Sequence, residues 1–272
     1  MTRQRILITG AAGRLGRELR PRLARPGRTL RLLDIAEVGP PAPGEDAEIV
    51  RASFTDPEAI DAACRDVDAV LHLGGLAGEA TWERIAETNV KGTLRVLEAV
   101  RRRRVPRVVL ASSIHAVGFH TRGAMDYMVD GTLPADVPPR PDTYYGVGKA
   151  ACEALGSLYH SRFGIDVTCL RIGAFRTLPL APEDLAVWLS PGDAARLVEA
   201  GLRAAPAGFR VLWGISGNTR RWWSLKEAEA IGYHPEDDAE RYAASIPGAT
   251  AYDPADPRNH RVGGGFCTMP LG

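Results

Sequence analysis

A glycine-rich turn near the N-terminus constrains the fold of this chain more than any other feature. Gly10, Gly13 and Gly16 separate a short apolar run, residues 6–8, from a helical pattern that begins at Leu15. Glycine permits a tight turn from a strand into a helix, and it lets a phosphate approach the unpaired N–H groups of the first helical turn. The pattern therefore predicts a strand–turn–helix unit that binds a pyrophosphate.

A second apolar run points to a dinucleotide. Residues 30–33 end in Asp34, which lies about twenty residues past the glycines, where a carboxylate accepts hydrogen bonds from the adenosine ribose. The alternative is a strand-end carboxylate that only caps a loop. A carboxylate repels a 2′-phosphate, and no arginine follows it in residues 34–39. We therefore expect NAD as the cofactor rather than NADP.

Strand and helix patterns alternate along the rest of the chain. Strands are expected at 47–52, 67–73, 107–111, 166–171 and 209–213, and helices at 56–64, 82–103, 145–163 and 192–204. This alternation predicts an α/β fold, a Rossmann-type doubly wound parallel sheet with a small C-terminal substrate lobe. We expect one domain over residues 1–272. About 1–172 would form the NAD-binding core, and about 173–272 would form mostly the substrate lobe and a C-terminal cover, with a late strand returning to the core.

The composition limits the partners. A net charge of +1 over 272 residues gives no reason to expect nucleic acid or an anionic membrane surface. No apolar stretch approaches the roughly 18 residues of a membrane span. The cysteines show no paired metal spacing, which favours reduced thiols in a cytoplasmic protein without a metal. We expect a small-molecule substrate and leave open a homo-oligomer.

Side chains that follow strands supply the chemistry. Ser112 and Ser113 come after the strand at 107–111, while Tyr145 and Lys149 are four residues apart and share one face of a helix. A phenol has an unperturbed pKa of about 10. A nearby ammonium and a positive nicotinamide ring favour the phenolate. Tyr145 can then take the proton of a substrate hydroxyl while nicotinamide takes the hydride. Ser113 would hydrogen-bond the same oxygen.

These motifs resemble the extended short-chain dehydrogenase/reductase superfamily, that is, the NAD-dependent epimerases and dehydratases. Within it, the chain is most similar to the uronate dehydrogenases. The similar segments are 10–16, Asp34, 72–75, 89–93, 112–113, Tyr145 with Lys149, 170–173, the region of Trp188, and Trp222-Trp223. The resemblance implies NAD-dependent oxidation of the anomeric carbon of a uronic acid to a lactone. It also implies that Ser113, Tyr145 and Lys149 are catalytic and that Asn89 supports the lysine.

Motifs and resemblance together give the expected contacts. For the cofactor these are Gly10, Ala12, Gly13, Arg14, Leu15, Gly16, Asp34, Ser53, Phe54, Leu73, Gly74, Gly75, Asn89, Tyr145 and Lys149. For the substrate they are Ala77, Ser113, Ile114, His115, Tyr145, Ala174 and Arg176. His115 has an equally good alternative as a strand-end histidine bonded to the backbone.

The expected substrate site departs from the family. Polar residues of the family are replaced here by Ala77, Ile114 and Ala174, and an aspartate that is frequent in relatives is replaced by Ser53. The arginine that holds the sugar carboxylate falls near Glu183 or Asp184, whose charge would repel it, although Arg176 can substitute. We therefore expect poor activity on uronates and a preference for a less polar or uncharged hydroxyl substrate.

Two other functions are compatible with the same motifs. A nucleotide-sugar epimerase or dehydratase shares the catalytic residues, but it usually carries a larger lobe than the residues after Lys149 allow. A regulator that binds NAD without turnover typically loses the tyrosine or the lysine, and this chain keeps both.

Overall fold

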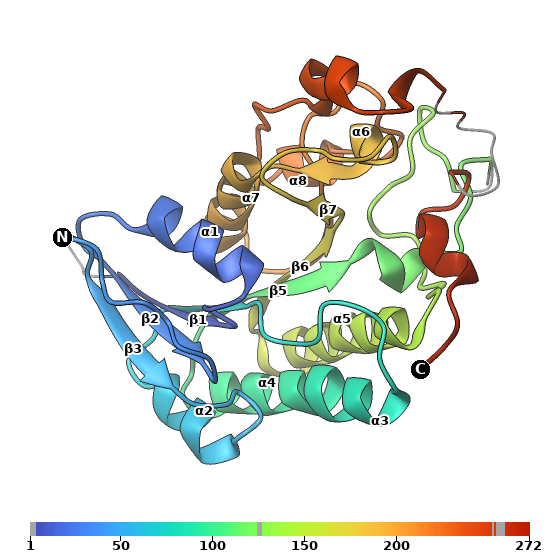
Figure 1. Ribbon diagram of the computed structural model, residues 1–272. Helices are drawn as coiled ribbons and strands as arrows, with labels where there is room; N and C mark the ends of the chain where they lie inside the picture. The colour runs from blue at the N-terminus through green and yellow to red at the C-terminus, as the bar shows by residue number, and fades with distance from the viewer. Residues whose placement is uncertain (1–3, 124–126, 252, 254–258) are drawn as a thin grey trace.

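The computed structural model describes residues 4–123, 127–251, 253 and 259–272 (Figure 1). Its main sheet has seven parallel strands in the order β3-β2-β1-β4-β5-β6-β9. The strands are β1 (Gln4–Thr9), β2 (Arg28–Asp34), β3 (Ala47–Arg51), β4 (Ala69–His72), β5 (Arg107–Ser113), β6 (Asp166–Ile172) and β9 (Phe209–Gly214). The predicted doubly wound parallel sheet is confirmed, and the late strand does return to it beside β6.

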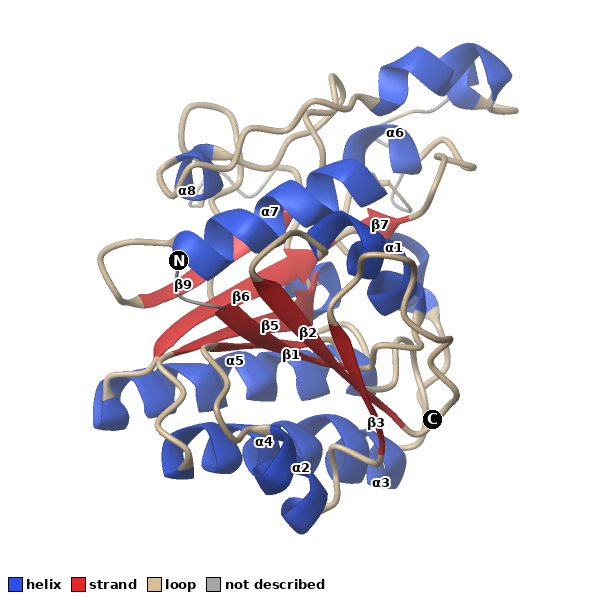
Figure 2. Ribbon diagram, turned by 90° about the vertical axis from the view of Figure 1, so that its left-hand side faces the viewer, coloured by secondary structure: helices blue, strands red, loops and turns tan. Residues whose placement is uncertain are grey.

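Helices cover both faces of this sheet (Figure 2). α1 (Arg14–Leu23) and α7 (Pro191–Arg203) lie on one face, and α2 (Pro57–Ala63), α4 (Gly92–Arg102) and α5 (Tyr144–Phe163) lie on the other. Side chains of a strand alternate between faces, so Ile6 and Ile8 join one apolar cluster while Leu7 joins the second. Burial on both faces explains why these strands read as continuous apolar runs.

One predicted helix contains an unusual turn. The helical stretch begins with α3 (Trp82–Ile85), continues as a π-helix, η1 (Ala86–Lys91), and ends as α4. π-turns are rare and frequent at functional sites. Asn89 lies in this wider turn, with its side chain buried.

Two strand predictions need correction. Ser112 and Ser113 are the last residues of β5 and do not follow it, because they pair with Arg171 and Ile172 of β6. A second, two-stranded sheet of β7 (Ala174–Phe175) and β8 (Trp188–Leu189) was not predicted. Its strands are too short to show a period in the sequence.

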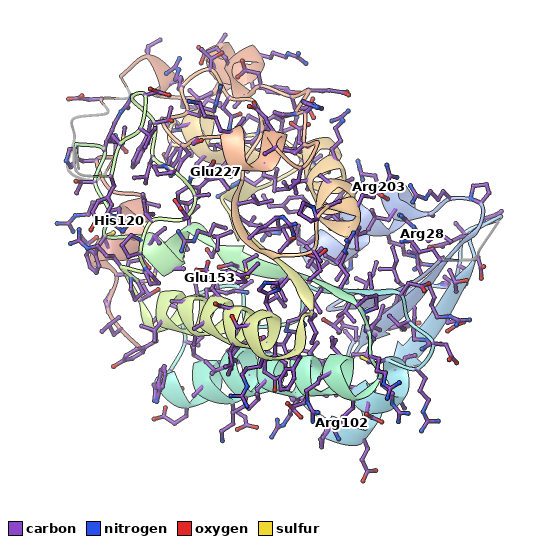
Figure 3. All side chains as sticks on the ribbon, turned by 180° about the vertical axis from the view of Figure 1, so that it is seen from behind. Arg28, Arg102, His120, Glu153, Arg203 and Glu227 are labelled. Carbon is purple, nitrogen blue, oxygen red and sulfur yellow. The ribbon has the colours of Figure 1, made fainter. Side chains whose placement is uncertain are left out.

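A lobe lies above the carboxyl ends of the strands (Figures 1 and 2). It contains α6 (Asp184–Val187), α8 (Lys226–Glu229) and the 3-10 turns η2 (Ile114–Val117), η3 (Ala239–Ser245), η4 (Ala249–Ala251) and η5 (Gly264–Thr268). Arg171 of β6 ties the core to the loop that follows β5, because its guanidinium donates to the Ala135 and Val137 carbonyls. The guanidinium is held by a buried ion pair with Glu153 on α5, labelled in Figure 3.

The C-terminal tail, residues 259–272, lies along the segment that follows β5. Val262 N–H donates to the His120 carbonyl at 2.9 Å, and Gly263 N–H donates to the Gly118 carbonyl at 3.0 Å. The tail ends where Gly272 N–H donates to Glu79. Within the described residues, no helix is long and apolar enough to cross a membrane, and no cluster of side chains is suited to hold a metal ion.

Candidate active site at the carboxyl edge of the sheet

The glycine turn has the tight geometry that its spacing predicts. Gly10 has a φ of +71°, and a β-carbon there would lie 2.7 Å from the backbone nitrogen of Gly74. A β-carbon at Gly16 would lie 2.4 Å from the Ala11 carbonyl oxygen. No described side chain caps the start of α1 at Gly13, so the first N–H groups of the helix stay available to an anion. These features fit the pyrophosphate of a dinucleotide.

Asp34 lies against this turn. One of its carboxylate oxygens accepts from Ala12 N–H at 2.9 Å, and the other accepts from Ala36 N–H at 2.9 Å. The side chain therefore does cap a loop, which was the alternative to a ribose contact. A carboxylate has about four acceptor sites, so these two bonds leave room for ribose hydroxyls.

Residues around the end of β4 support the turn. The ring of Phe54 packs between Gly74 and Gly92, where a β-carbon would lie 2.6 Å and 2.5 Å from it. Leu73 N–H donates to the Thr9 carbonyl, and the Ser53 hydroxyl accepts from Thr55 N–H. Phe54 thus has a packing role here, and the predicted contacts of Ser53, Phe54 and Leu73 with NAD stay predictions.

His72 was not identified from the sequence. Burial lowers its pKa to about 3, so its ring is neutral at ordinary pH. Its two ring nitrogens lie 2.6 Å from the Thr9 hydroxyl and 3.1 Å from the Thr93 hydroxyl. The imidazole therefore links β1 and β4 to α4 directly beneath the glycine turn.

Asn89 holds the loop that carries Gly75 and Ala77. Its amide oxygen accepts from Leu76 N–H at 2.8 Å, and its amide nitrogen donates to the Leu76 carbonyl at 3.1 Å. Gly75, with a φ of +148°, lies against that oxygen. The resemblance implied support of Lys149 by Asn89. The side chain of Asn89 bonds to the loop instead, and the support of the lysine stays a prediction.

Tyr145 and Lys149 share the buried face of α5, as predicted. Both side chains are more than nine-tenths buried. The Lys149 ammonium donates to the Ala111 carbonyl at 2.5 Å and lies 5.7 Å from the centroid of the Tyr145 ring. No described residue hydrogen-bonds to the Tyr145 hydroxyl. The phenol is therefore available to a substrate beside a fixed positive charge.

The first turn of α5 is fixed by two acceptors. The Thr143 hydroxyl accepts from Gly146 N–H at 3.1 Å, and Glu79 accepts from the N–H groups of Tyr144 at 3.3 Å and Tyr145 at 2.8 Å. A carboxylate is favoured at a helix N-terminus. Sequence reasoning missed Glu79, because it is 66 residues from Tyr145 and belongs to no motif.

Ser113, Ile114 and His115 differ in where they point. The Ser113 hydroxyl accepts from His115 N–H at 3.2 Å, and the His115 ring lies 5.8 Å from the Tyr145 ring. Ile114 is 8% exposed and belongs to an apolar cluster. The His115 ring thus lies beside Tyr145, and Ile114 packs in the core. The predicted substrate contacts of Ser113, Ile114 and His115 stay predictions.

Asp184, one of the two acids near Arg176, is bonded within the lobe. It accepts from Leu180 and Ala181 N–H and lies 3.3 Å from the Arg176 guanidinium. The predicted repulsion of a substrate carboxylate stays a prediction. Arg176 directly follows β7, two residues after Ala174. Arg14, on the glycine turn, reaches the carbonyl of Phe175 in the same strand at 3.4 Å.

The sequence matches a family model and several known proteins. A family model described as "NAD dependent epimerase/dehydratase family" matches residues 6–175, more than half of the chain. The chain belongs to this family. Uronate dehydrogenase from Pseudomonas putida is 37% identical over 262 residues, which cover 96% of this chain and 95% of that protein.

A second relative and a solved structure are also similar to this chain. NAD-dependent glucose-6-phosphate dehydrogenase from Haloferax volcanii is 33% identical over 257 residues, covering 88% of this chain and 95% of the relative. The crystal structure of a uronate dehydrogenase variant from Agrobacterium tumefaciens, complexed with NAD, superposes with a TM-score of 0.89 at 35% identity, covering 99% and 98% of the two chains. The chain is thus an NAD-dependent dehydrogenase of the uronate-dehydrogenase type.

Proposed function

We propose that the chain oxidises the anomeric hydroxyl of a sugar to a lactone, with Ser113, Tyr145 and Lys149 as its catalytic residues. The position of the Tyr145 phenol carries this proposal. The centroid of the Tyr145 ring lies 5.7 Å from the Lys149 ammonium and 5.8 Å from the centroid of the His115 ring. Ser113 is joined to that segment through the N–H of His115.

The proton and the hydride leave the substrate by separate paths. Tyr145 takes the proton of the hydroxyl, and the C–H hydride would pass to the nicotinamide that bound NAD supplies. A C=O bond forms, and the Ser113 hydroxyl donates to its oxygen. The Lys149 ammonium lies beside the phenol, 5.7 Å from the centroid of its ring. The glycine turn holds the pyrophosphate, and Asp34 accepts from the ribose.

The preferred sugar is uncharged. Arg176 shares its charge with Asp184 at 3.3 Å, and Ala77 and Ala174 offer no side-chain hydrogen bond. Each polar group of a uronate that is buried without a partner costs about 1–3 kcal/mol. These losses favour a neutral aldose over the uronates on which the Pseudomonas putida relative acts, as its name states.

An NADH absorbance assay with D-galactose, D-galacturonate and D-glucose 6-phosphate tests the proposal. We expect NADH from D-galactose, with kcat/KM at least about tenfold above that for D-galacturonate, which differs only at C6. Arg176→Ala should leave KM for D-galactose unchanged. A sub-millimolar KM for D-galacturonate with fast turnover would contradict the substrate preference and make Arg176 a carboxylate clamp.

The same assay separates the other functions. An epimerase would change the configuration of a sugar without net NADH, and a regulator would bind NAD and leave every sugar unchanged. The retention of Tyr145 and Lys149, both buried at one site, favours turnover over regulation. A cytoplasmic location and a homo-oligomer stay predictions from the sequence.

A further inference from the structure

Behind the reacting groups, a buried carboxylate is bonded to His115. The side chain of Asp142 has no exposed surface, and its Oδ2 lies 2.7 Å from Nδ1 of His115. Its Oδ1 accepts from the Thr143 hydroxyl at 3.0 Å. Asp142 also directly precedes the Thr143 that caps α5, so the carboxylate is fixed by the same turn that fixes Tyr145.

Two glycines from distant segments reserve the space for this carboxylate. A β-carbon at Gly118, which follows η2, would lie 1.9 Å from Asp142 Oδ2. A β-carbon at Gly263, in the C-terminal tail, would also lie 1.9 Å from that oxygen. Neither position can carry a side chain while Asp142 points at His115. The backbone of Gly263 donates to that of Gly118, which closes the tail over the pair.

The remaining surroundings fix the imidazole and leave one nitrogen available. Phe266 of the tail stacks on the His115 ring with centroids 3.9 Å apart, and Tyr145 meets its edge. The His115 side chain is 14% exposed, and no described residue bonds to its Nε2. A carboxylate only accepts, so in the neutral imidazole Nδ1 carries the hydrogen and Nε2 presents a lone pair.

We propose that Asp142 is a positioning residue that fixes His115 in the tautomer whose Nε2 accepts a hydrogen bond from a second hydroxyl of the substrate. This inference rests on the proposed function, which gives the oxidised oxygen to Ser113 and Tyr145. Because His115 lies directly beside both, its Nε2 meets the substituent on the neighbouring carbon. The substrate class is therefore an aldose with a free C2 hydroxyl.

A double-mutant cycle on kcat/KM for D-galactose tests the role of Asp142. Asp142→Asn and His115→Ala should each lower kcat/KM about 10- to 100-fold, mainly through KM, with the Kd for NAD unchanged. An amide can donate to Nδ1 and so favour the other tautomer. Adding Asp142→Asn to His115→Ala should cause no further loss. Additive losses would mean that Asp142 does not act through His115, and would overturn the proposal.

Two further measurements make the test specific. On 2-deoxy-D-galactose, Asp142→Asn should have an effect below about twofold, and an undiminished effect would refute the C2 hydroxyl contact. Nitrogen NMR of the imidazoles, with His115 assigned through His115→Gln, should show the Nδ1–H tautomer in the NAD complex and its loss in Asp142→Asn. An Nε2–H tautomer in the unaltered protein would refute the proposal without any turnover. Absence of NADH with every sugar would instead count against the proposed function.

Discussion

The cofactor half and the substrate half of this site are built in different ways. The part of the cofactor half that is predicted to bind the pyrophosphate and ribose is local: residues 6–16 and Asp34 lie in one strand–helix–strand unit, joined by bonds such as that from Ala12 N–H to the Asp34 carboxylate. The substrate half is assembled from separate segments. Asp142 is 27 residues from His115, and Cys267, whose thiol donates to the Gly118 carbonyl, is 149 residues from its partner.

This difference explains what each half can tolerate. A glycine turn bound through backbone groups constrains the residue types at each position, since any side chain would overlap with another backbone. Contacts between distant segments constrain only pairs of residues. The substrate half can therefore change its side chains, as at Ala77 and Ala174, while the fold and the cofactor half stay the same.

The largest expected effect lies where the two halves meet. Tyr145→Phe removes only the hydroxyl that takes the proton, so kcat should fall by about 10²- to 10⁴-fold while the Kd for NAD stays within about twofold. Absorbance assays for NADH measure kcat, and fluorescence titration with NAD measures the Kd. Retention of more than a few per cent of the turnover would remove Tyr145 from the proton path.

The second prediction breaks the cofactor half alone. Gly10→Ala combines a left-handed φ of +71° with a contact of 2.7 Å to Gly74, so it should cost about 2–5 kcal/mol of unfolding free energy and raise the Kd for NAD strongly. Gly27→Ala is the matched control, because Gly27 has a φ of +79° but nothing within 4 Å. It should cost about 1–2 kcal/mol and leave NAD binding intact. Equal costs in urea unfolding would show that the close approach to β4 is unimportant.

The third prediction concerns cofactor choice, which depends on Asp34. The unaltered protein should prefer NAD over NADP, and Asp34→Asn should reduce that preference about 10-fold or more, because the amide no longer repels a 2′-phosphate. In Asp34→Asn only one of the two side-chain atoms that accept from Ala12 N–H and Ala36 N–H is still an acceptor, so some loss of stability is expected. The ratio of kcat/KM for the two cofactors gives the answer. Equal use of both by the unaltered protein would contradict the role of Asp34.

The same contrast explains which parts of the fold and of the site could be predicted from the sequence. The central strands, such as β1 and β4, were predictable because each is an apolar run buried on both faces, and the glycine turn because its residues lie close together in the sequence. Tyr145 and Lys149 were predictable from helical spacing. Glu79, Asp142 and Phe266 were not, because each meets the site through a contact that spans tens of residues or more and has no local pattern. The pairing of Asp184 with Arg176 was likewise not predicted, although the two residues are close in the sequence, because no local pattern shows that their side chains meet.

The smallest expected effect tests the substrate half through the tail. Among the described residues of the site, Phe266 stacks on His115, with centroids 3.9 Å apart. Aromatic pairs contribute about 0.5–1.5 kcal/mol, which is roughly a 2- to 12-fold change. Phe266→Ala should therefore raise KM for D-galactose by that factor and leave kcat and the Kd for NAD unchanged.

A remote phenylalanine separates this effect from general loss of packing. Phe163, at the end of α5, is 48% exposed and stacks under Arg101 far from the carboxyl edge. Phe163→Ala should leave KM unchanged. If Phe266→Ala raised the Kd for NAD as much as KM, the tail would belong to both halves of the site, and the contrast between a local cofactor half and an assembled substrate half would fail at this point.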